Sequence, residues 1–172
     1  MIDLNNNFLI KNLSSWGPMI ILFISVLNEF DFNYLGFDFF SFNFSYILIF
    51  FWSLKKITHF GYGMVCVAGV INDVVLGLPI GISSLCFLLL CVATSYLRSI
   101  TLRPNIIKDW FFFLVSISLV NTISYLILSV FFSINLNYFD LVINTIFTFT
   151  VYFIFAYFFN IYHKIFMGNL NA

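Results

Sequence analysis

Long runs of residues without a charged side chain constrain this chain more than any other feature. One run extends from Trp110 to Ser133, and another follows Asp140 as far as Tyr162. A helix of about 20 apolar residues crosses the hydrocarbon core of a bilayer and satisfies its own backbone hydrogen bonds there. The runs lack the alternation of apolar and polar residues that is typical of outer-membrane strands. The sequence therefore predicts an all-α integral membrane protein.

The composition supports this prediction. Only 8% of the 172 residues are charged and the mean hydropathy is +1.06, whereas an ordinary soluble domain carries about 25% charged residues. The net charge is zero, so we expect no basic face that binds nucleic acid. Six spans would use roughly 120 residues, which leaves no room for a separate soluble domain.

Polar residues, glycines and prolines divide the chain into a predicted six-transmembrane-helix bundle, a single membrane domain over residues 1–172. No small-residue cleavage site follows the first apolar run, so we expect an uncleaved span there and not a signal peptide. The second run is short and rich in aromatic residues. The expected spans are about 13–30, 39–54, 60–78, 82–97, 109–133 and 140–162.

The basic residues predict the orientation of these spans. If the chain crosses the membrane six times, all seven Lys and Arg residues fall on one side of it: Lys11, Lys55, Lys56, Arg98, Arg103, Lys108 and Lys164. The positive-inside rule then places both termini in the cytoplasm. Trp16, Trp52 and Trp110 lie near the predicted cytoplasmic span ends, at the interfacial depth that tryptophan prefers.

Asp73 is the ionisable residue that most needs an explanation, because it lies inside the predicted third span. A charged group at the centre of a span costs at least about 2.5 kcal/mol on insertion scales and is a functional-site hypothesis by default. Gly69, Asp73 and Gly77 are four residues apart and therefore share one helix face. Small residues at this spacing allow another helix to approach closely, so we expect this stripe to face protein.

Two interpretations of Asp73 stay open at this point. In the first, the carboxyl group anchors a polar junction, either with the turn Gly77-Leu78-Pro79-Ile80-Gly81 or with a partner subunit. In the second, it lies at a helix end, reaches interfacial water and only caps nearby backbone donors. A proton relay would need a series of ionisable groups, and Asn72 is the only other strongly polar side chain close by in the sequence.

The sequence shows no catalytic apparatus, so we expect a protein that is not an enzyme. The segment Gly81-Ile82-Ser83-Ser84-Leu85 lacks the second glycine of a nucleophile elbow, and no HExxH or phosphate-binding glycine loop is present. Cys66, Cys86 and Cys91 lack metal-ligand spacing, and we expect neither a metal nor a cofactor. The hydroxyl and amide groups of the last two spans are expected to make interhelical hydrogen bonds; among them are Asn121, Asn144, Thr145 and Thr148.

The segment Gly61 to Leu85, GYGMVCVAGVINDVVLGLPIGISSL, resembles the central signature of the bacterial rod-shape-determining protein MreD family. That signature is Gly-x-x-x-Asp-x-x-x-Gly with a further glycine in a short turn, after a helix that ends in an aromatic and basic stretch. The matching residues are Gly69, Asp73, Gly77 and Gly81, with Pro79 inside the turn. They are the candidate partner-interface or structural residues.

The resemblance implies a non-enzymatic component of the bacterial inner membrane that supports peptidoglycan insertion and the maintenance of rod shape. The partners that it implies are an MreC-like scaffold, a RodA-like glycosyltransferase with its transpeptidase, MreB-like filaments and membrane lipid. The family is also similar in fold to the substrate-binding membrane subunits of energy-coupling-factor transporters. A vitamin-type transporter subunit is therefore the alternative function. Such a subunit needs a pocket of convergent polar groups between apolar walls.

Overall fold

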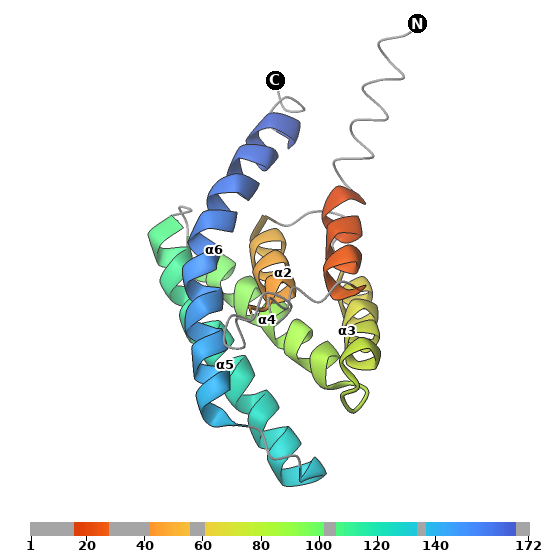
Figure 1. Ribbon diagram of the computed structural model, residues 1–172. Helices are drawn as coiled ribbons and strands as arrows, with labels where there is room; N and C mark the ends of the chain where they lie inside the picture. Colours follow the sequence, from red (N-terminus) through yellow and green to blue (C-terminus); the bar gives the residue numbers. More distant parts are fainter. Residues whose placement is uncertain (1–15, 28–41, 56–60, 102–105, 134–136, 168–172) are drawn as a thin grey trace, which may run out of the picture.

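The computed structural model describes residues 16–27, 42–55, 61–101, 106–133 and 137–167, and this part of the chain is helical without any strand (Figure 1). The all-α prediction is confirmed for these residues. The helices are an N-terminal helix Trp16–Leu27, α2 Phe44–Lys55, α3 Tyr62–Leu76, α4 Ile82–Ile100, α5 Ile106–Phe132 and α6 Tyr138–Met167.

Three helices are long and apolar enough to cross a membrane, namely Ile82–Ile100, Ile107–Phe132 and Tyr138–Ile161. The other three are shorter than the predicted spans. α2 has 12 residues and α3 has 15, which at 1.5 Å per residue gives lengths of about 18 and 22 Å, whereas the hydrocarbon core is about 30 Å thick. The first predicted span ends, and the second begins, within residues 28–41, which lie outside the described part of the chain.

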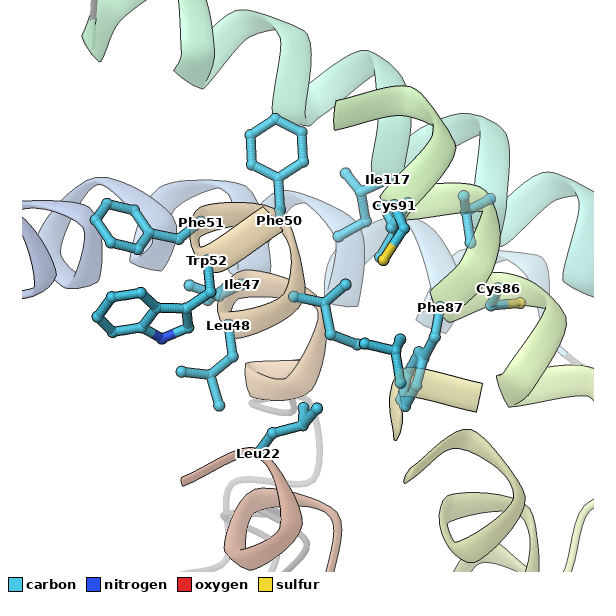
Figure 2. Close-up of a cluster of buried hydrophobic side chains, with 14 of the residues drawn as sticks. Leu22, Ile47, Leu48, Phe50, Phe51, Trp52, Cys86, Phe87, Cys91 and Ile117 are labelled. Atoms are coloured by element: carbon cyan, nitrogen blue, oxygen red, sulfur yellow. The ribbon is translucent and has the colours of Figure 1, made fainter. Parts of the chain in front are cut away.

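α2 forms the centre of the core. Six consecutive residues from Ile47 to Trp52 are buried, so the helix is covered on all sides, as expected for a helix that is apolar all round. The ring of Phe50 lies 4.9 Å from that of Phe113 in α5 and 5.7 Å from that of Tyr152 in α6. Figure 2 shows the side chains of α2 leaving the helix toward its neighbours in several directions.

The three tryptophans differ in their surroundings. Trp16 is 46% exposed, but Trp52 is completely buried, because its large ring fills space between packed helices. Trp110 stacks on Phe149 with ring centroids 4.4 Å apart, and its Nε1–H donates to the Phe149 carbonyl oxygen at 3.0 Å. Trp52 therefore contacts protein on all sides, and its interfacial depth stays a prediction.

Polar groups join neighbouring helices, as the sequence predicted. Asn121 Nδ2 in α5 donates to Thr145 Oγ1 in α6 at 2.8 Å. Between α2 and α4, the hydroxyls of Ser53 and Thr94 are 2.6 Å apart, and Arg98 Nη1 donates to the Ser53 carbonyl oxygen at 3.3 Å. The last contact brings Arg98 to the end of α2 that carries Lys55, which agrees with placing these two cations on one side.

The packing of the core predicts that truncation of a buried phenylalanine lowers the free energy of unfolding far more than truncation of an exposed one. We expect Phe50→Ala to lower the free energy of unfolding in detergent by about 3–5 kcal/mol, because it leaves a cavity where three helices meet. Phe131→Ala is the control, since that ring is 77% exposed. Unfolding titrations of both variants measure the difference, and equal stabilities would contradict the central position of α2.

Candidate functional site

Residues 77–81 join α3 to α4 in a tight turn that needs two residues with positive φ. Gly77 has φ 65° and follows the last residue of α3, and its N–H donates to the Asp73 carbonyl oxygen. The N–H of Leu78 donates to the same oxygen at 2.9 Å. This six-to-one bond after a left-handed glycine is the Schellman ending of a helix. The first glycine of the turn therefore stops α3.

Gly81 starts the next helix. It has φ 108°, and the N–H of Ile82 lies 3.4 Å from the carbonyl oxygen of Pro79. A positive φ at the third of four residues is the type II turn, which favours glycine there. Ile80, at the tip, is 75% exposed. The chain thus reverses within five residues, and α3 and α4 form a hairpin (Figure 1).

The carboxylate of Asp73 closes this hairpin. Its Oδ2 accepts the N–H of Gly81 at 2.7 Å, and its Oδ1 accepts the N–H of Ser83 at 2.8 Å. These N–H groups belong to the beginning of α4, where the first backbone donors of a helix have no partner within the helix and where the helix dipole favours a negative charge. Asp73 itself is 0% exposed, so its charge is held by backbone donors and the helix end.

Gly69 allows the two helices to come together one turn earlier. A Cβ built at this position would collide with the Cα and N atoms of Ser84 in α4. The hydroxyl of Ser84 in turn donates to the carbonyl oxygen of Cys66 at 2.9 Å. Glycine therefore permits backbone contact between α3 and α4, and this contact brings Asp73 within reach of the α4 N-terminus.

The structure brings the five candidate residues into one unit, but in different surroundings. Gly69 and Asp73 are buried, Pro79 and Gly81 are half-buried, and Gly77 is exposed. Asp73 forms the expected junction with the turn. Of the second interpretation, the capping of backbone donors is seen as well, whereas the carboxyl group does not reach water, because the same chain covers it completely. Gly69 and Asp73 face α4, so any partner would contact other residues of the hairpin.

A cavity of about 500 Å³ lies beside the hairpin, at the end of the bundle where residues 77–81 form the turn; we call this the hairpin end. Asn72 lines it and donates through Nδ2 to Ser83 Oγ at 2.9 Å. Ser83 also lines the cavity, and the other polar lining residues are Ser25, Asn43, Ser45, Tyr46, Asn121, Ser124, Asn137, Asp140 and Asn144. Sequence reasoning did not find this site as a whole, because it interpreted the polar groups inside the last two apolar runs, among them Asn121 and Asn144, as groups that join helices.

The chemistry of the hairpin is structural. Both carboxylate oxygens of Asp73 already accept hydrogen bonds, which leaves the group a positioning role. Within the described ranges, no group of three His, Cys, Asp or Glu residues could hold a metal ion. Cys66, Cys86 and Cys91 are free thiols. Comparisons of the chain with known protein families, with curated proteins and with solved structures found no match.

Two glycines of α3 provide a matched test of the close helix approach. We expect Gly69→Ala to reduce the free energy of unfolding by about 1–3 kcal/mol, because the new methyl group forces α3 and α4 apart. Gly63→Ala should be neutral or stabilising by up to about 1 kcal/mol, since a Cβ at that position meets nothing within 4 Å. Unfolding in detergent compares them, and an equal effect at the two positions would contradict the packing described.

A second test concerns the carboxylate. Asp73→Ala leaves the N–H groups of Gly81 and Ser83 without acceptors, and each buried unsatisfied donor costs about 1–3 kcal/mol. We therefore expect a loss of about 2–4 kcal/mol in unfolding free energy, with Asp73→Asn in between because it keeps one acceptor oxygen. Asp140→Asn, at an exposed position, is the control. A stability of Asp73→Ala equal to that of the control would show that the junction contributes nothing.

Proposed function

We propose that the chain is a non-enzymatic membrane scaffold of the MreD type, which binds an MreC-like protein and supports peptidoglycan insertion during elongation of a rod-shaped cell. The observation that carries the proposal is the double contact of Asp73 with the N-terminus of α4. With this contact, each residue of the MreD-like pattern has a structural role in the hairpin of α3 and α4. Gly69 permits the approach of α4, Gly77 and Gly81 form the turn, and Asp73 fastens it.

A rigid hairpin with an apolar outer face suits a scaffold. On α3, the side chains of Val67, Val70 and Val74 are 49%, 36% and 66% exposed and follow one another at helical spacing. They lie away from Val65 and Gly69, which are buried. Helices associate in lipid through close van der Waals packing, so this face would fit the single span of an MreC-like protein.

The proposal includes six spans with both termini in the cytoplasm of a bacterial inner membrane. The cavity supports the alternation of the spans. It is lined by residues from the end of the N-terminal helix, the start of α2, the end of α3, the start of α4, the second half of α5 and the start of α6. Successive helices therefore run alternately toward and away from the hairpin end. A RodA-like glycosyltransferase with its transpeptidase and MreB-like filaments would join through MreC.

Surface variants of the hairpin test the scaffold. We expect the double variant Val70→Phe, Val74→Phe to lower recovery of a co-expressed MreC-like protein about tenfold, which corresponds to about 1.4 kcal/mol of binding free energy. The added rings disturb the face without entering the core. The matched control is Val115→Phe, Val130→Phe on α5, where both side chains are also exposed.

Recovery is measured by affinity purification in mild detergent, and thermal unfolding shows that both double variants are folded. Undiminished recovery with the α3 variant would remove this face from the interface. An equal loss with the α5 variant would show that the effect is not specific to the hairpin.

One observation favours the second candidate, a substrate-binding subunit of a vitamin-type transporter. The cavity supplies the polar groups and apolar walls that such a subunit needs. The two candidates differ in what copurifies with the chain, which is an MreC-like protein for the scaffold and a small molecule for the transporter subunit.

A further inference from the structure

We propose that the turn of the hairpin, residues 77–81, lies within the hydrocarbon of the bilayer and is covered there by lipid acyl chains, below the headgroups on that side. The partner of this surface is therefore the lipid chain itself. The inference goes beyond the scaffold proposal and requires only that the hairpin of α3 and α4 is embedded in a membrane. It rests on the reach of the helices, on the side chains at the tip and on the backbone hydrogen bonds of the turn.

The position of Arg98 limits how far the hairpin reaches. Its Nη1 donates to the carbonyl oxygen of Ser53 at 3.3 Å, so the guanidinium group is held beside the end of α2 that carries Lys55. A cation at the end of a span lies at the level of the headgroups, where its charge is solvated. Ile82 precedes Arg98 by 16 residues in α4, which corresponds to about 24 Å of helix. Since the hydrocarbon core is about 30 Å thick, the turn lies about 6 Å below its far boundary, and any tilt of α4 lowers the turn further.

α6 reaches further from the same level. The ring of Phe159 lies 5.6 Å from that of Trp52, and Trp52 precedes Ser53 in α2, so this part of α6 lies close to the level of Arg98. Phe139 precedes Phe159 by 20 residues in α6, which corresponds to about 30 Å of helix. The start of α6 lies at the hairpin end, because it lines the cavity there. It therefore approaches the boundary that the turn does not reach.

The side chains at the tip of the hairpin suit contact with lipid. Ile80 is 75% exposed, and Val75 and Leu76 at the end of α3 are 41% and 44% exposed. The turn itself contains only Gly, Leu, Pro and Ile, whereas turns that face water commonly include Asn, Asp or Ser. Exposed aliphatic groups are unfavourable against water and are favourable against acyl chains. The tip is therefore better matched to the hydrocarbon than to the aqueous surface.

Tyrosines mark the opposite end of the hairpin. Tyr62 at the start of α3 is 56% exposed and Tyr96 near the end of α4 is 61% exposed, and the hydroxyls of Tyr62 and Ser95 are 2.9 Å apart. The sequence between Tyr62 and Tyr96 contains neither tyrosine nor tryptophan. These two residue types are enriched at the membrane–water interface, and α6 begins with one of them, Tyr138. The hairpin therefore has interfacial side chains at one end and none at its turn.

The backbone of the turn is prepared for surroundings without water. Residues 77–83 contain six N–H groups, because Pro79 has none. Five of these groups donate to acceptors within the hairpin, namely those of Gly77, Leu78, Gly81, Ile82 and Ser83. An unpaired backbone group is costly in hydrocarbon, which excludes ordinary loops from it. A turn at the membrane surface would obtain acceptors from water, so the buried carboxylate of Asp73 suits a turn that water does not reach.

Fluorescence quenching tests this inference on the full chain in liposomes. A bimane label on Ile80→Cys is compared with one on Phe139→Cys, because Phe139 is 70% exposed and so matches Ile80 in exposure. One quencher is bromine on the lipid acyl chains, and the other is iodide in the water on both sides. We expect the ratio of bromine to iodide quenching to be at least about threefold higher at position 80, because an anion is excluded from hydrocarbon. The parent chain, labelled in parallel, corrects for Cys66, Cys86 and Cys91.

The length of the acyl chains provides a second measurement. In a bilayer whose hydrocarbon core is about 6 Å thinner than the usual 30 Å, the turn would reach the headgroups. Iodide quenching at position 80 should then rise toward the value at position 139. Leu76→Cys repeats both measurements from the end of α3, where the side chain is also exposed. Thermal unfolding shows that the labelled variants are folded.

Three outcomes would overturn the inference. Equal quenching ratios at positions 80 and 139 would place the turn at the membrane surface. Weak quenching of position 80 by both agents would show that protein and not lipid covers the tip. Iodide quenching at position 80 that does not respond to bilayer thickness would contradict the depth derived from α4. Each of these results would leave the scaffold proposal intact, because that proposal is judged by recovery of the MreC-like protein.

Discussion

The interaction on which this structure depends is the acceptance of four backbone N–H groups by one residue. The carbonyl oxygen of Asp73 receives those of Gly77 and Leu78, and its carboxylate receives those of Gly81 and Ser83. The end of α3 and the beginning of α4 are therefore satisfied together. In apolar surroundings such groups are costly if they remain unpaired, so a single carboxylate removes the main obstacle to a sharp reversal of the chain at the end of the bundle.

The turn that Asp73 holds in place also fixes the positions of the residues around it. Since Asp73 fixes the start of α4, Ser84 lies against Gly69 and Ser83 lies within reach of Asn72. One face of the hairpin is thereby closed by backbone contact, and its edge becomes a wall of the cavity. The outer face keeps its exposed valines. The scaffold surface that we propose and the cavity thus share one support, although they lie on different sides of it.

The sequence was informative where only a few kinds of surroundings can accommodate a residue. A charge in an apolar run and glycines four residues apart singled out Asp73 and the close approach of another helix, and a junction with the turn was one of the interpretations left open. Helix lengths were less predictable, since apolar composition does not show where α2 begins and ends. The burial of Trp52 could not be foreseen, because it depends on residues that are distant along the chain, such as Phe159. The cavity could not be foreseen either, because contacts such as that of Asn43 with Asn144 bring its lining together.

The position of α2 has a consequence for biogenesis. α2 precedes α5 and α6 in the chain, yet the rings that contact Phe50 are Phe113 of α5 and Tyr152 of α6. The 12 residues of α2 make a helix of about 18 Å, which is shorter than the hydrocarbon core of a bilayer. α2 therefore acquires its complete apolar cover only after α5 and α6 have been synthesised.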